Sequence, residues 1–441
     1  MNENINAESG GTGSLESSID QAPISRLQAT TYLLCALVMM IEGYDLVSMP
    51  FSVPHIVRAW NVAPSGFSIA LSAALAGLAA GAIGIAPLGD RFGRRPLILA
   101  AVVLVGLATI GTATSTTFTA LVIWRFLTGI ALGTGLANLP ALVAELAPRR
   151  RRAGLLTLVS CGIPLGGVGA GLIVPMLAGR GGWQMIFTIP GVATLAIAVL
   201  LYFVLPESPK WLLAKGKHER LARVAARLGI AGHDWAPPAV GGAKPSALAA
   251  LGRGHRFATF VFCSLYGVNA SILYGLISWT PTLLAEAKFP LDQTSRLASL
   301  IQLGGLVTAP ALSWFLDRSR AVSALIFLYI VIGVALLSFS AMPPTTLGWS
   351  VLLLLAGGGV SGTHLAIMAL GATFYPPPIL SSALGFGLAV ARVGAIAGPL
   401  VGGILIGAGV GPAVFLAALV VPVVACAGLV LLIPRVNTVH D

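Results

Sequence analysis

The chain consists of long apolar runs that are separated by short breaks of charge, proline and glycine. An apolar run of about 20 residues is long enough to cross a bilayer as a helix. Such runs are expected at 27–51, 66–88, 97–114, 118–146, 153–176, 183–205, 257–284, 294–316, 321–341, 346–375, 380–408 and 411–433. The pattern therefore predicts an all-α membrane protein with twelve transmembrane helices.

One long polar interval, residues 206–256, divides the twelve runs into two groups of six. It separates an expected bundle at 26–205 from a second bundle at 257–435. The halves also resemble each other, because Asp90-Arg91 ends the second run and Asp317-Arg318 ends the eighth. Two parallel six-helix bundles with a cavity between them at the midplane are typical of rocking transporters. We therefore expect two pseudo-symmetric bundles.

The composition excludes a soluble domain. Hydrophobic residues make up 56% of the chain and charged residues only 9%, whereas about 25% of an ordinary soluble domain is charged. Most of the 26 Lys and Arg lie in the tails and in the loops that follow the even-numbered runs, which indicates that these loops and both termini are cytoplasmic. The net charge of +11 therefore indicates topology and contact with membrane lipid, and no nucleic acid partner is expected.

Two polar segments are expected outside the bilayer. Residues 1–25 are polar and lack Lys and Arg, so they are predicted to be a disordered cytoplasmic tail without the basic start of a signal peptide. Loop 206–256 is basic, and its stretch 217–229 has helical spacing. We expect this stretch to be an amphipathic tether on the membrane surface.

Two carboxyl groups and one guanidinium group lie inside apolar runs. Glu42 and Asp45 share one face of the first span, and Arg125 lies in the fourth span at a similar depth, roughly 10 Å below the outer surface. A buried Arg needs a partner, and Asp45 is the expected one. Because two neighbouring carboxylates do not both ionise cheaply, the three residues are predicted to form a proton-coupling site. The alternative is an ion pair that only fixes helix packing.

A second charged group follows the second span. Asp90, Arg91, Arg94 and Arg95 surround the turn at Gly93 and are predicted to form a charge-assisted clasp between helix ends, with a weaker copy at Asp317 and Arg318. Glu145, at the inner end of the fourth span, is expected to pair with these arginines and to steady the outward-open state. The alternative is ordinary anchoring by positive charge on the cytoplasmic side.

Arg392 lies about 18 Å into the eleventh span, near the midplane. A guanidinium at this depth is costly unless it meets an anion, and its planar fork matches a carboxylate. Arg392 is therefore predicted to bind substrate, with Tyr266, Asn269 and Tyr274 of the seventh span supplying an aromatic wall and hydrogen bonds. Packing roles remain alternatives, and for His364 in the tenth span packing is favoured over proton transfer.

Covalent chemistry is not expected. The four cysteines lie inside apolar runs without a paired spacing, and the six histidines are scattered. These positions form neither a metal-ligand pattern nor a Ser/His/Asp constellation. The sequence therefore predicts no enzyme activity and no cofactor.

Several of these motifs resemble those of the major facilitator superfamily. The loop Asp90-Arg-Phe-Gly-Arg-Arg95 and the element Arg125-xxx-Gly129-xxx-Gly133 are similar to its signatures, and the resemblance covers nearly the whole chain after residue 25. Two positions depart from the usual pattern: Ala86 stands where glycine usually opens the loop motif, and Leu380 stands where an inner arginine is usual.

The element Glu42-Gly-Tyr-Asp45 resembles the first span of the aromatic acid:proton symporters, and its Glu42 is closest to the hydroxyphenylpropionate branch. This resemblance implies uptake of a small aromatic monocarboxylate with protons, by alternating access in a bacterial inner membrane. We expect a monomer. Efflux by proton antiport on the same fold is the alternative, and it predicts drug resistance without saturable uptake.

Overall fold

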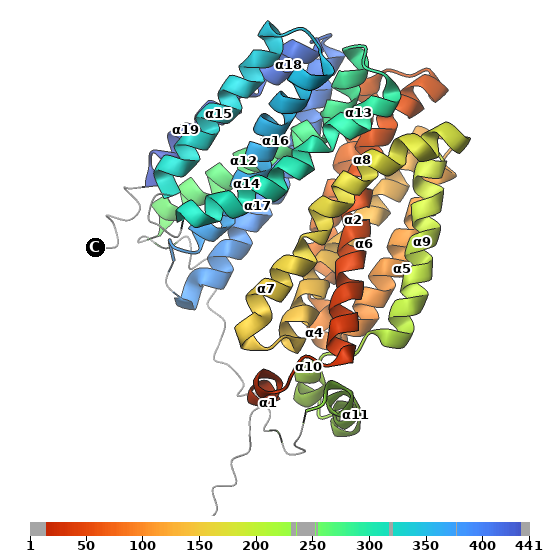
Figure 1. Ribbon diagram of the computed structural model, residues 1–441, viewed down its shortest axis with the longest axis vertical. Coiled ribbons are helices and arrows are strands. Elements are labelled where there is room, and N and C mark those ends of the chain that lie inside the picture. The colour runs from red at the N-terminus through yellow and green to blue at the C-terminus, as the bar shows by residue number, and fades with distance from the viewer. Residues whose placement is uncertain are drawn as a thin grey trace, which may run out of the picture.

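The computed structural model describes residues 15–230, 235, 252, 255–316, 321–375 and 377–433. These residues form helices and short turns, arranged as two bundles that lie side by side (Figure 1). The first bundle contains α2 (Arg26–Trp60), η1 (Pro64–Phe67), α3 (Ser68–Ala80), η2 (Gly81–Ile85), α4 (Leu88–Phe92), α5 (Arg94–Ala113), α6 (Phe118–Leu146), α7 (Arg149–Ser160), α8 (Gly162–Gly181) and α9 (Met185–Val204).

The second bundle follows a linker that contains α10 (Pro209–Ala214) and α11 (His218–Leu228). Its helices are α12 (Arg256–Glu286), α13 (Leu291–Ala298), α14 (Leu300–Leu316), α15 (Ala321–Ala341), α16 (Thr346–Gly371), α17 (Pro377–Gly407), α18 (Pro412–Ala418) and α19 (Val420–Val430).

The twelve predicted spans correspond to these helices. Eleven stretches among the described residues are long and apolar enough to cross a membrane. The remaining predicted span, the eighth, is formed by α13 and α14, which a break at Ser299 divides into pieces of 8 and 17 residues. The prediction of an all-α membrane protein with two pseudo-symmetric six-helix bundles is confirmed, although individual boundaries shift by several residues, as at the C-terminal end of α2.

The pseudo-symmetry is visible in how the helices pair. Helix α2 packs closely on α8, and α12 packs in the same way on α17. A Cβ atom on Gly43 would lie 1.9 Å from the carbonyl oxygen of Ile163, and one on Gly394 would lie 2.0 Å from that of Gly267. Only glycine permits such an approach of two backbones, so the first and fifth spans and the seventh and eleventh spans meet in equivalent ways.

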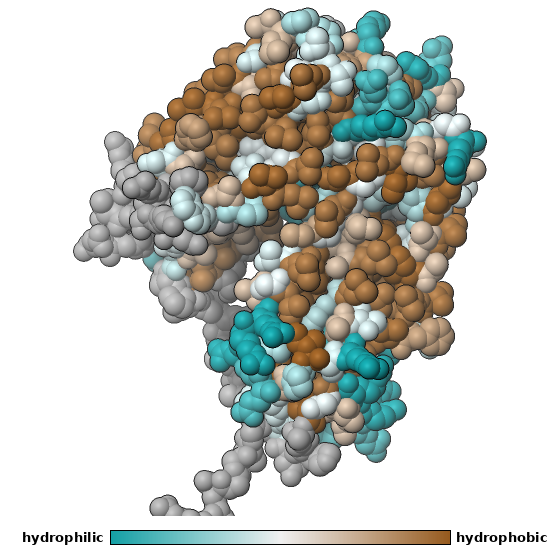
Figure 2. All heavy atoms as spheres, viewed as in Figure 1, coloured by the Kyte–Doolittle hydropathy of each residue, from teal (hydrophilic) through white to brown (hydrophobic). Residues whose placement is uncertain are grey.

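The outer surface suits a bilayer. Large apolar side chains are exposed around the bundles, for example Phe203 and Leu347, with 72% and 78% of their surface accessible. On the face seen in Figure 2 apolar residues cover the middle, while hydrophilic residues gather toward the two ends. This distribution is what contact with lipid chains requires.

The predictions for the tail and the linker need correction. Residues 15–21, placed in the disordered tail, form helix α1 (Leu15–Gln21), because Leu15 and Ile19 lie one turn apart and are both buried. Residues 1–14 lie outside the described part of the chain. Helix α11 is present as predicted, but its apolar residues belong to a buried cluster with α1 and α10, so protein rather than lipid covers its apolar face.

Two seams join the bundles at one end, which we call the η1 end because it holds η1, α13 and the last turn of α17. In the first seam Ser72 donates to the carbonyl oxygen of Ile396 (3.0 Å), and Gly403 faces Ser68. In the second, Gly171 accepts a hydrogen bond from Ser295 (3.4 Å) through its carbonyl. These seams join the second span to the eleventh and the fifth to the eighth, so they are equivalent under the pseudo-symmetry.

Candidate functional site

The ion pair expected from equal depth in the first and fourth spans is confirmed. Nη2 of Arg125 donates to Oδ2 of Asp45, and these two side chains have 1% and 2% of their surface exposed. The second oxygen of Asp45 accepts from the hydroxyl of Thr109 at 3.1 Å. Nη1 of Arg125 lies 3.4 Å from the hydroxyl of Ser48. Both carboxylate oxygens of Asp45 therefore have donors inside the first bundle.

This ion pair borders the interface between the bundles. Asp45 and Arg125 line a narrow cavity whose opposite wall comes from α12, through Tyr274, Ile277 and Ser278. A group bound in this cavity would touch both halves of the molecule. The ion pair therefore lies beside the surface where the two bundles meet.

Glu42 lies in a different environment from Asp45. It is buried, and among the described residues its Oε2 has no hydrogen-bond partner. Its other oxygen packs on the backbone of α6, where a Cβ on Gly135 would lie 2.3 Å away. Among the described residues the carboxyl group has no ion-pair partner, and burying its charged form there would cost several kcal/mol. The two acids of the predicted proton-coupling site are thus distinct: one is ion-paired and one is not.

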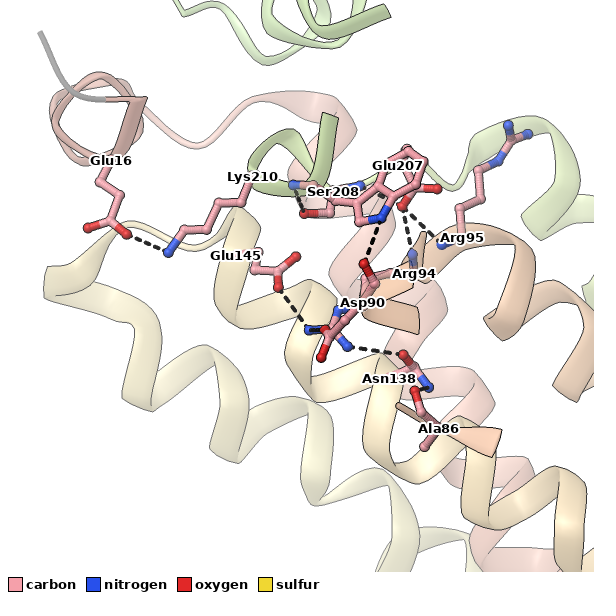
Figure 3. A network of polar contacts seen from close by, with 11 residues as sticks. Glu16, Ala86, Asp90, Arg94, Arg95, Asn138, Glu145, Glu207, Ser208 and Lys210 are labelled. Atoms are coloured by element: carbon pink, nitrogen blue, oxygen red, sulfur yellow. Dashed lines mark hydrogen bonds and ion pairs between the residues drawn. The ribbon is translucent and has the colours of Figure 1, made fainter. Parts of the chain in front are cut away.

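The charged loop forms a clasp at the end of the first bundle opposite η1, which we call the basic end (Figure 3). Nη2 of Arg94 contacts Oδ1 of Asp90 at 2.7 Å and Oε1 of Glu145 at 3.3 Å. Its Nη1 donates to Oδ1 of Asn138 (3.2 Å), whose own amide group donates to the carbonyl of Ala86. Arg94 therefore ties the second, third and fourth spans together.

The other predicted members of the clasp lie elsewhere. The guanidinium of Arg95 donates to the carbonyl of Tyr202 and lies 5.6 Å from its ring centroid. Arg91 lies on the ring of the neighbouring Phe92. Among the arginines of the loop, only Arg94 makes the expected contacts with Asp90 and Glu145, and Asp317 and Arg318 lie outside the described residues.

Glu207 is a member of this site that sequence reasoning missed. Its Oε1 accepts from the backbone amides of Arg94 (2.9 Å), Arg95 (3.1 Å) and Ser208 (2.9 Å), as Figure 3 shows. A carboxylate at a helix N-terminus satisfies free N–H groups and complements the helix dipole. Gly93, with φ of 108°, leaves room for it. Sequence spacing gives no signal for this contact, because Glu207 lies 113 residues after Arg94.

In the second bundle, Arg392 lies near the middle of α17 and is partly buried. It makes no ion pair or hydrogen bond with another residue in the part of the chain that the structure describes. It lies within electrostatic range of Tyr266 and His364. The alternative that Arg392 is held by a carboxylate on another helix has no support among the described residues.

An aromatic wall connects this arginine to the cavity beside Asp45. The ring of Tyr266 stacks on Phe262 and lies 4.7 Å from the ring of His364. The ring of Tyr274 meets His364 edge-on at 6.5 Å and also lines the cavity. The predicted residues Tyr266 and Tyr274 are therefore brought together, with His364 between them.

Asn269 is placed differently from these aromatic residues. It is fully buried, with 0% of its surface exposed. Its Nδ2 donates to the carbonyl of Val360 (3.3 Å) and lies 3.5 Å from Nδ1 of His364. Its Oδ1 lies 2.9 Å from the hydroxyls of both Tyr329 and Thr363. A side-chain amide has two N–H groups and two lone pairs. All four are occupied, so Asn269 faces the inside of its own bundle.

Comparison with known proteins agrees with this arrangement. The family model described as Major Facilitator Superfamily matches residues 32–386. The 4-hydroxybenzoate transporter of Pseudomonas putida is 32% identical over 415 residues, which cover 92% of this chain and 93% of that protein. The 3-(3-hydroxy-phenyl)propionate transporter of Escherichia coli K12 is 30% identical over 388 residues, covering 88% and 89%.

The fold has solved counterparts as well. A bacterial homologue of the human lysosomal transporter Spinster, in an inward-facing and unoccupied conformation, superposes with a TM-score of 0.71 at 17% identity. The match covers 93% of this chain and 98% of that one. The chain belongs to the Major Facilitator Superfamily, in which it groups with these aromatic acid transporters.

Proposed function

We propose that the protein takes up an aromatic monocarboxylic acid together with protons, by alternating access. The names of its relatives, a 4-hydroxybenzoate transporter and a hydroxyphenylpropionate transporter, support this substrate class. The proposal includes no covalent step and no cofactor. Substrate, protons and the surrounding lipid are its partners, and the monomer is the transporting unit.

The observation that carries the proposal is the guanidinium of Arg392, which has no ion-pair partner in the described part of the chain. The second bundle contains only three carboxylates in its sequence, Glu286, Asp292 and Asp317, and all three lie near the ends of spans. A guanidinium in the middle of a span needs an anion. A substrate carboxylate satisfies it with two parallel hydrogen bonds.

Proton coupling is assigned to the first bundle. Asp45 is paired with Arg125, whereas Oε2 of Glu42 has no hydrogen-bond partner among the described residues, so burial of a charge on Glu42 is costly. Opening and closing of the cavity changes the solvation of both acids, so proton binding and the conformational change are linked. Glu42 and Asp45 exchange the proton, and Arg125 sets the charge of the site.

Alternating access to the two sides of the membrane then needs one gate at each end of the molecule. The seams at the η1 end close the outer side, and the Arg94 clasp at the basic end steadies the first bundle while the inner side opens. In this proposal the basic end and both termini face the cytoplasm, which the distribution of Lys and Arg supports, and the protein lies in a bacterial inner membrane.

Transport in proteoliposomes tests this proposal. Labelled 4-hydroxybenzoate should accumulate inside vesicles when the exterior is made acidic, and accumulation should stop when a protonophore removes the gradient. Protein-free liposomes control for diffusion of the neutral acid. Accumulation that is unaffected by the protonophore, or export driven by the same gradient, would contradict symport and favour the efflux alternative.

A further inference from the structure

The aromatic wall contains one polar donor that the proposed function leaves unused. His364 on α16 lies between the rings of Tyr266 and Tyr274 and is partly exposed. Its Nδ1 faces Asn269, and no hydrogen bond to its Nε2 is present among the described residues. One ring nitrogen is therefore turned toward the bundle interior, while the other remains available to a ligand.

Asn269 fixes which nitrogen carries the proton. The carbonyl of Val360 accepts from Nδ2 of Asn269, and a carbonyl only accepts, so the amide cannot be turned around. The second N–H of the same amide then faces Nδ1 of His364 at 3.5 Å. Nδ1 must be the acceptor, and a neutral imidazole that accepts at Nδ1 carries its hydrogen on Nε2.

The amide itself is held firmly. Its oxygen lies 2.9 Å from the hydroxyls of both Tyr329 and Thr363, which come from α15 and α16. All of these side chains except the histidine are fully buried. Donors whose orientation is fixed by a supporting layer discriminate between ligands better than donors that rotate. The hydroxyls of Tyr266 and Tyr274 rotate, and each of them both donates and accepts.

We propose that His364 recognises the ring hydroxyl of the substrate through its Nε2–H and so determines specificity for hydroxylated aromatic acids. This inference rests on the proposed function, in which Arg392 binds the carboxylate. The guanidinium is the stronger ligand for that anion, which leaves the neutral N–H for the uncharged phenolic oxygen. Asn269 is then a positioning residue, not a substrate ligand.

The test compares two acids that differ by one hydroxyl group. The dissociation constants of 4-hydroxybenzoate and benzoate are measured on the purified full-length protein in detergent, by ligand-induced thermal stabilisation. One hydrogen bond of ordinary strength corresponds to an affinity ratio of about fivefold in favour of the hydroxylated acid. His364→Leu should reduce this ratio to about one and leave benzoate binding unchanged. His364→Gln, which keeps an N–H donor, should retain part of the preference.

Two control variants separate recognition from packing. Tyr375→Phe and Tyr44→Phe each remove one buried hydroxyl outside this network, where the two hydroxyls contact Thr259 and the carbonyl of Ile186; both variants should keep the preference. Equal binding of the two acids by the wild type, a preference that survives in His364→Leu, or a preference that disappears in either control would overturn the role of His364. Failure of the wild type to bind either acid would overturn the proposed function itself, which is a distinguishable result.

Discussion

Removing each of the two arginines within the spans should have unequal consequences for stability. Arg125→Ala leaves Asp45 buried with 2% of its side chain exposed and without a counter-charge, and breaking such a pair costs about 3–5 kcal/mol of unfolding free energy. Arg392 is partly buried and has no ion-pair partner among the described residues. Arg392→Ala should therefore change the stability of the ligand-free protein by less than about 1 kcal/mol.

Bound ligand should separate Arg392→Ala from the wild type. At a concentration one hundred times its dissociation constant, 4-hydroxybenzoate should stabilise the wild type by about 2.7 kcal/mol. Arg392→Ala should lose this stabilisation, and Arg392→Lys, which keeps the charge but not the planar fork, should retain only part of it. Thermal unfolding of the purified variants, with and without the acid, measures both effects. Ligand stabilisation that persists in Arg392→Ala, or a ligand-free Arg392→Ala as unstable as Arg125→Ala, would refute the assignment.

Three further outcomes follow from the packing at the two ends. Gly171→Val should hold the η1 end open, because a Cβ at this position already lies 2.4 Å from Ser299. In this variant, labelling of a cysteine introduced at Ser299 should rise. Gly179→Val is the matched control, since a Cβ there meets nothing within 4 Å. Glu207→Ala should cost about 1–2 kcal/mol by exposing the N-terminus of α5, and an unchanged melting curve would exclude that capping role. Lys210 lowers the pKa of Glu16 below its usual 4.5 through a hydrogen bond and its charge, so this contact stabilises α1 above that pH and is lost as the pH falls through the lowered pKa. As the pH is lowered, the protection of α1 from proteolysis should fall in the wild type relative to Glu16→Gln, which has no carboxyl group to protonate, and an equal pH dependence of the two proteins would contradict the link.

The fold was predictable from the sequence because it depends on the length and number of the apolar runs. Each apolar run of bilayer length must be helical, and the polar interval after residue 205 divides the runs into equal groups. The pairing of Asp45 with Arg125 was also predictable, since each is a charge that needs a partner at the same depth. These conclusions depend on distance along a helix axis, which residue numbers give directly.

Rotation about the helix axis was not predictable in the same way. Helices such as α6 and α12 are apolar around most of their circumference, so periodicity does not indicate which face meets another helix. Asn269 therefore appeared to be a ligand residue, although α15 and α16 enclose it. Glu207 lies far along the chain from the amides that it caps, and only the folded turn at Gly93 brings them together.

The central claim is that substrate and proton enter together. The most direct measurement is the movement of protons when 4-hydroxybenzoate is added to weakly buffered proteoliposomes without an imposed gradient, with a pH indicator outside and protein-free vesicles as the control. The account predicts that the wild type makes the exterior alkaline beyond the control in a saturable manner. It predicts that Asp45→Asn abolishes this signal while substrate exchange across the membrane persists. Substrate entry by the wild type without proton movement, or an undiminished proton signal in Asp45→Asn, would contradict it.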